Sequence, residues 1–99
     1  MKKLVPLKEF KYEVGPLSLV VEHFISSEYK NIVEFYIGGK SIWSNTYSTY
    51  FQAEVKFLII KNILKSLKAK FSDLKPEDIN PLKVKEISKD FLIEFKKIK

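Results

Sequence analysis

Three consecutive residues, Gly39-Lys40-Ser41, match the end of a phosphate-binding loop and are the first feature that could do chemistry. Such a loop has the pattern G-x-x-x-x-G-K-[ST], follows a strand and opens a helix whose N–H groups hold the phosphates. The position of its first glycine is occupied here by Glu34, and a carboxylate there would repel phosphate. The residues after Ser41 favour a strand rather than a helix. The sequence therefore predicts a hairpin turn at this place and no nucleotide cofactor.

Groups suited to acid–base, nucleophilic or metal chemistry are few. The single histidine, His23, lies in an apolar segment without a partner nearby in the sequence, and there is no cysteine. Disulfides, thiolate nucleophiles and multi-histidine metal sites are thereby excluded. Glu77 and Asp78 follow Pro76, where carboxylates stabilise the start of a helix, so their spacing does not require a metal. We expect no catalytic residue and no metal site, and hence no enzyme.

Lysines and aromatic residues carry the strongest remaining functional signal. All 18 basic residues are lysine and the formal net charge is +6. Lys61, Lys65 and Lys68 recur one helical turn apart and could follow a phosphate backbone, while Trp43 and Tyr36 could stack on bases. Because arginine makes the commonest specific base contact, binding by lysine alone would follow charge and shape rather than sequence. These five residues form the candidate surface for nucleic acid or a protein partner.

The elements that must position these residues belong to a single domain, residues 1–99. Apolar residues make up 45% of the chain, which is typical of a globular protein. No apolar run approaches the ~20 residues that span a bilayer, so we expect no membrane partner. Charged residues from Lys8 to Glu13 interrupt the N-terminal segment and exclude a signal peptide, which favours an intracellular location.

Three strands are predicted in the first half, at residues 17–25, 32–37 and 40–47. Gly38-Gly39 between the last two favours a two-residue hairpin turn, since such turns need positive φ. This turn would pair Phe35 with Ile42 on the core face. Trp43 would then lie opposite Glu34 on the other face, close to Tyr36.

A long amphipathic helix is predicted at about residues 50–71. Thr49 followed by Gln52 three residues later has the pattern of a capping box. Apolar residues at spacings of three and four form one stripe: Ala53, Phe57, Ile60, Leu64, Leu67 and Phe71. Val55, Ile59 and Ile63 make the apolar face wider than one small sheet would cover, so a homodimer is a further expectation.

The last third of the chain supports two alternatives. Residues 82–98 can form a hairpin, since Phe91, Ile93 and Phe95 alternate with other residues as in a strand. They can also form an amphipathic helix capped by Asn80, with Pro81 at its first position. We favour the hairpin. The predicted fold is therefore α+β: an antiparallel sheet of four or five strands with the 50–71 helix packed across one face.

Two segments, "YKNIVEFYIGGKSIW" and "YFQAEVKFLIIKNILKSLKAKF", together with lysine-only basicity and the absence of cysteine, resemble small orphan proteins of crenarchaeal viruses of the lipothrixvirus and rudivirus type. The many lysines and glutamates also fit a hyperthermophile. The resemblance implies a viral accessory protein in the cytoplasm of an infected host cell. Some such proteins bind host proteins as antagonists of defence. We therefore expect a non-enzymatic protein-binding factor, with sequence-neutral nucleic-acid binding as the alternative.

Overall fold

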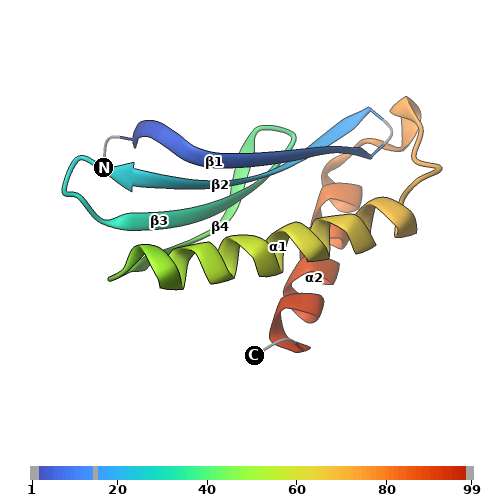
Figure 1. Cartoon of the computed structure of the whole chain (residues 1–99). Helices are drawn as coiled ribbons and strands as arrows, with labels where there is room; N and C mark the ends of the chain where they lie inside the picture. Colours follow the sequence, from blue (N-terminus) through green and yellow to red (C-terminus); the bar gives the residue numbers. More distant parts are fainter. Residues whose placement is uncertain (1–2, 15, 98–99) are drawn as a thin grey trace.

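Four consecutive antiparallel strands precede two helices in the computed structural model, which describes residues 3–14 and 16–97 (Figure 1). The strands have the spatial order β1-β2-β3-β4, so each pairs with its neighbour in the sequence and β1 and β4 form the two edges. The elements and their bounds are β1 (Lys3–Val14), β2 (Leu17–Ser26), β3 (Asn31–Ile37), β4 (Lys40–Tyr47), α1 (Tyr50–Lys70), the 3₁₀ turn η1 (Pro76–Asp78) and α2 (Pro81–Lys97). The predicted α+β fold with an antiparallel sheet is confirmed.

The core lies between one face of the sheet and the two helices. Figure 1 shows α1 running along the strands and α2 crossing it. Alternate residues of β2 and β3, such as Val21 and Phe35, are fully buried against α1 residues such as Ile60 and Leu64. Phe91 of α2 stacks on Phe35 with ring centroids 4.2 Å apart. Both helices thus share one apolar layer with the sheet.

Helix α1 begins where the sequence predicts. The Thr49 hydroxyl oxygen accepts a hydrogen bond from the backbone N–H of Gln52 at 3.2 Å, which caps the first turn. The predicted apolar stripe is buried, including Ala53, Phe57 and Leu67. The helix ends at Lys70, one residue before the predicted end, and Phe71 is its C-cap.

The predicted C-terminal hairpin is wrong, because residues 81–97 form helix α2. The Asn80 side-chain oxygen accepts a hydrogen bond from the Lys83 backbone N–H at 2.9 Å, and Pro81 occupies the first helical position. Ile87 and Phe91 are buried on one side of this helix, whereas Ile93, which a strand would have placed beside Phe91, is 43% exposed. Helix caps and helical periodicity therefore outweigh the β propensity of the aromatic and branched residues.

The first strand, β1, was not assigned from the sequence. It pairs with β2 over Lys3–Val14, with irregular register between Lys3 and Lys8. Its outward positions carry alternating lysines and glutamates, which is compatible with an edge strand but gives no strong strand pattern. The sheet keeps four strands because β1 is present and the C-terminal pair is absent.

The predicted register of the β3–β4 hairpin is also wrong beyond its first two pairs. Gly38 and Gly39 have φ of 58° and 84°, as a primed turn requires. Tyr36 then pairs with Ser41, but Phe35 pairs with Trp43 rather than Ile42. Ile42 is thus the extra residue of a β-bulge, which moves every later side chain of β4 to the opposite face. Trp43 consequently faces the helices.

Candidate protein-binding surface

The sheet separates the two aromatic residues predicted to lie together. Trp43 packs on the helix side, with its ring 5.0 Å from that of Phe95. Tyr36 lies on the other face, where its hydroxyl donates a hydrogen bond to Glu34 at 2.8 Å. Desolvation, followed by Glu34 and Glu22, raises the pKa of Tyr36, so this hydroxyl keeps its proton. Trp43 and Tyr36 therefore cannot form one stacking platform.

The predicted lysine row does lie on one side of α1. The Lys61 ammonium is 4.5 Å from the ring centroid of Phe10, and the Lys68 ammonium is 4.7 Å from that of Tyr12. Lys65 lies between them along the helix and is exposed. Since both rings belong to β1, this row borders the sheet edge opposite Trp43. The five predicted residues are thus distributed over three separate places.

His23 lies inside the protein rather than in an open site. Its side chain is fully buried, and Nε2 is 3.1 Å from the side-chain oxygen of Asn31. The ring packs against Tyr50, with centroids 4.9 Å apart. The histidine therefore joins β2 and β3 to the start of α1, as a structural residue would.

The face of the sheet away from the helices carries a row of carboxylates. Glu9, Glu22 and Glu34 stand opposite one another across β1, β2 and β3. Glu34 accepts hydrogen bonds from the hydroxyls of Tyr36 and Ser41. Within residues 3–14 and 16–97, no group of three or more acidic, histidine or cysteine residues is arranged to hold a metal ion. Two hydroxyl donors thus hold the carboxylate of Glu34 at one end of this row.

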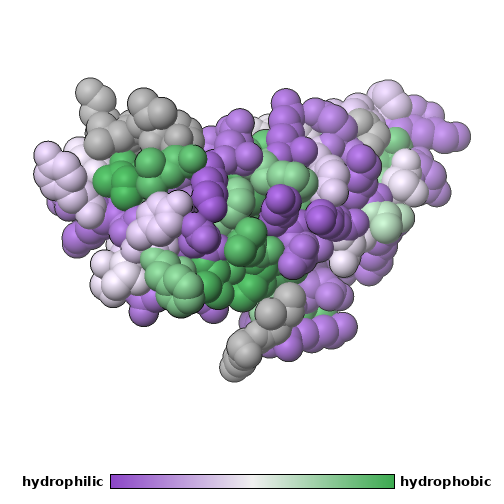
Figure 2. Space-filling view, in the orientation of Figure 1, coloured by the Kyte–Doolittle hydropathy of each residue, from purple (hydrophilic) through white to green (hydrophobic). Residues whose placement is uncertain are grey.

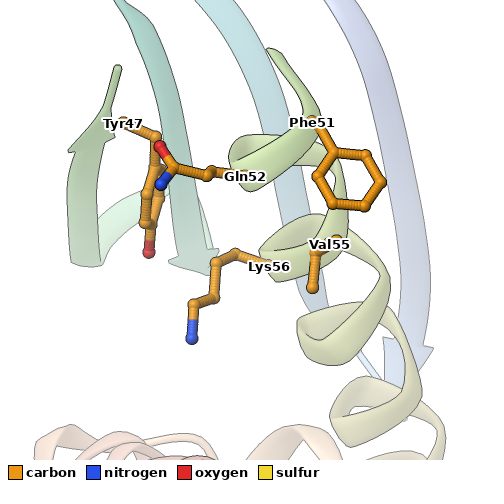
Figure 3. Close-up of a pocket in the computed structure, with 5 residues that line it drawn as sticks. All are labelled: Tyr47, Phe51, Gln52, Val55 and Lys56. Carbon is orange, nitrogen blue, oxygen red and sulfur yellow. The ribbon is translucent and has the colours of Figure 1, made fainter. Parts of the chain in front are cut away.

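An apolar cavity lies at the junction of β4 and α1. It has a volume of about 250 Å³ and is lined by Tyr47, Phe51, Gln52, Val55 and Lys56. Figure 3 shows Tyr47 coming from the end of β4 and the other four side chains from the first two turns of α1. The shape of this cavity thus depends on the change of chain direction between β4 and α1, where Thr49 caps the helix.

A second cavity adjoins the first, because Tyr47 lines both. It has a volume of about 330 Å³ and includes Tyr29 and Lys30 from the β2–β3 turn. The Ser26 hydroxyl oxygen accepts hydrogen bonds from the N–H groups of Glu28 and Lys30, each at 3.2 Å. This turn holds Tyr29 at a φ of 60°, a left-handed conformation that is strained for a tyrosine, with its side chain 85% exposed.

An exposed apolar stripe continues from the first cavity along α1. Phe51 is 74% exposed, and Val55 and Leu58 follow at the i+4 and i+7 positions, on the side of the helix opposite the core. Figure 2 shows hydrophobic side chains gathered on this side of the molecule, in the region of the first half of α1. We call Tyr29, Tyr47, Phe51, Val55 and Leu58 the junction surface.

Of the five residues of the junction surface, the sequence predicts only Val55 to be an apolar side chain that the sheet leaves uncovered. Ile63, predicted to be surplus as well, is buried, and Ile59 is partly buried. Phe51 and Leu58 could have been noticed, because they are apolar residues outside the predicted stripe. Tyr29 gave no such signal, since its conformation is set by the turn.

No protein-family model matches the chain, and no curated protein or solved structure is significantly similar to it. Neither helix in the described part of the chain is both long and apolar enough to cross a membrane. The functional interpretation therefore rests on the surfaces themselves.

Proposed function

We propose that this chain is a non-catalytic protein-binding module whose partner docks on the junction surface. The observation that carries the proposal is the exposure of Phe51, at 74%, next to an apolar cavity of about 250 Å³. Exposed apolar patches on small proteins mark interaction sites, and aromatic anchors supply much of the binding energy at such sites.

The strained conformation of Tyr29 supports the same conclusion. A left-handed backbone is cheapest for glycine, yet the turn places a large ring there and leaves it in solvent. Backbone strain of this kind is kept at functional sites, where the strained conformation places a side chain as function requires. Tyr29 lines the second cavity together with Tyr47, which also lines the first, so it would contact the same partner as Phe51.

The charge around the junction surface indicates the chemistry of the partner. Lys30 and Lys56 each line one of the two cavities, and the whole chain carries a net charge of +6. Complementary charge speeds encounter and excludes wrong partners. The partner is therefore an acidic protein surface with an exposed apolar segment. With the resemblance to crenarchaeal viral proteins, we propose a host protein, a defence factor among the candidates, met in the cytoplasm of an infected cell.

Photo-crosslinking tests this function. A benzophenone amino acid at position 58 would be irradiated in a crenarchaeal host lysate, in the parent chain and in Phe51→Ser. We expect a discrete acidic protein to be captured by the parent and lost with Phe51→Ser. The matched control is Leu82→Ser, which removes an apolar side chain that is 78% exposed on α2 and should leave capture unchanged. Equal capture by Phe51→Ser, or recovery of nucleic acid alone, contradicts the proposal.

Nucleic-acid binding through Lys61, Lys65 and Lys68 is the second candidate. It is favoured because no ion pair among the described residues occupies these three lysines. Three phosphate contacts would give a slope of log K against log salt near −3, at about 0.9 per contact on duplex DNA. Lys65→Glu should reduce this slope in a filter-binding assay without disturbing the ring contacts of the other two. Absence of binding by the parent chain at low salt excludes the candidate.

A further inference from the structure

The two edges of the sheet differ in how they are protected against pairing with another chain. Edge strands expose unpaired N–H and C=O groups. Charged residues, proline and irregular register on such a strand hinder its pairing with another chain. All three devices are present in β1: four charged residues from Lys8 to Glu13, Pro6, and register shifts on both sides of Pro6. The β1 edge is therefore protected.

The β4 edge has little of this protection. From Ser41 to Tyr47 it contains no charged residue and no proline, in a chain of which 30% is charged. The bulge at Ile42 lies near its start, and Trp43–Tyr47 then pairs with β3 in regular register. Within the described residues no strand lies on the other side of β4. Five consecutive residues thus present a regular and neutral edge, on which the Thr46 N–H donates to the side-chain oxygen of Asn45, at 2.9 Å, rather than to another strand.

Apolar side chains of α2 lie on the helix side of the sheet near this edge. Helix α2 covers β4 through the contacts of Phe91 and Phe95 with Trp43. Asp90 points to α1, because it forms an ion pair with Lys70 at 2.7 Å. Leu92 comes two residues later, about 200° further round the helix, so it points away from α1. Leu92 is 40% exposed there.

We propose that β4 pairs antiparallel with β4 of a second copy of this chain. The two four-stranded sheets then form one continuous sheet, with both pairs of helices on the same face. A neutral edge suits a second copy because two chains of net charge +6 can approach there without facing charges. Charged or acidic partners gain nothing from an edge that carries no charge.

The pairing also fits the side chains of β4. With the twofold axis at Asn45, Ser44 of one copy faces Thr46 of the other, a hydroxyl pair that is favourable across strands. Tyr47 faces Trp43 of the second copy on the helix side, so that copy borders the cavity at Tyr47. Phe51, Val55 and Leu58 on α1 stay free, whereas Tyr47 is shared with the junction surface. The inference is argued from the β4 edge alone and does not depend on the proposed function.

Charge substitution at Thr46 tests the pairing by analytical ultracentrifugation of the purified chain. Thr46 is exposed and stands opposite Ile32 in β3, so the monomer should tolerate Thr46→Lys and Thr46→Glu. Like charges near the axis should weaken the dimer of either variant about five- to tenfold at low salt. An equimolar mixture of the two should recover the parent affinity. Ser66→Lys, which adds the same charge on the exposed side of α1, should change nothing.

Crosslinking gives a second readout, because the chain has no cysteine of its own. Residues opposite each other in neighbouring strands are close enough for a disulfide, which needs Cα atoms within about 7 Å. Mild oxidation should therefore link Asn45→Cys into dimers and leave Ser66→Cys monomeric.

Three outcomes overturn the pairing. The first is a monomer at millimolar concentration. The second is a dimer that Thr46→Lys and the mixture leave unchanged. The third is a dimer that Phe51→Ser dissociates and Thr46→Lys does not, which would place the interface on α1 instead.

Discussion

Tyr29→Gly should stabilise the folded protein, because Tyr29 holds a left-handed backbone at a φ of 60°. That conformation costs an ordinary residue roughly 1–2 kcal/mol. Glycine removes this cost, but the greater conformational entropy of its unfolded state reduces the gain in stability by about 0.5–1 kcal/mol. The ring is 85% exposed, so its removal forfeits little packing. The net expectation is a gain of about 0.5–1 kcal/mol.

Thermal and urea denaturation followed by circular dichroism measure this gain. For a domain of this size 1 kcal/mol corresponds to about 4–8 °C, so the Tm should rise by roughly 2–8 °C. Lys30→Gly is the matched control, since it lies in the same turn without a positive φ. That variant should lose about 0.5–1 kcal/mol through the entropy of its unfolded state.

A lower Tm for Tyr29→Gly than for the parent would refute the reasoning. It would mean that contacts of the ring outweigh the backbone strain. If the junction surface binds the proposed partner, the same variant should be more stable yet capture less partner, which is the trade-off expected where a strained residue serves function. Unchanged capture would remove Tyr29 from the junction surface while leaving the stability prediction intact.

Three further predictions concern the packing and pH dependence of the fold. Phe91→Ala should cost about 3–5 kcal/mol in urea denaturation, because this fully buried ring stacks on the sheet, and a loss below about 1 kcal/mol would contradict the packing of α2. Asn80→Ala should cost about 1 kcal/mol by removing the cap of α2, and an unchanged stability would show that the cap is dispensable. Lys8 donates a hydrogen bond to Glu54 at 3.0 Å and lowers the pKa of Glu54 below its ordinary 4.5, so this contribution is present above that value and is lost as pH falls through the lowered pKa. Glu54→Gln should therefore be less stable than the parent near pH 7 and equal to it near pH 2, and a difference that persists in acid would be inconsistent with this pair.

Several elements follow from the sequence because neighbouring residues decide them. Gly38 and Gly39 can adopt the positive φ of a tight turn whatever surrounds them. Thr49 caps α1 through a contact only three residues away, and the apolar stripe of this helix has a single period. These interactions are local, so strands β2, β3 and β4 and the long helix α1 are placed correctly from the pattern alone.

Helix α2 shows where local patterns are insufficient. Residues 82–98 carry both a strand alternation and a helical stripe, and their propensities differ by too little to choose. The choice is made by burial: the helix places Ile87 and Phe91 in the core together, with Phe91 on Phe35. A strand would instead have placed Ile93, which is 43% exposed in the helix, on the same face as Phe91.

The position of Trp43 and the junction surface were decided only in three dimensions. One bulge residue, Ile42, turns Trp43 from solvent to the helices, where α2 supplies Phe91 and Phe95 to receive it. Phe51, Leu58 and Tyr29 are exposed because no other described element packs on them, which no local pattern records. The sequence by itself determined β2, β3, β4 and the long helix α1, since their turn, cap and apolar periodicity depend on contacts between near neighbours. The tertiary structure decided which apolar side chains remain uncovered, since that depends on how distant segments pack.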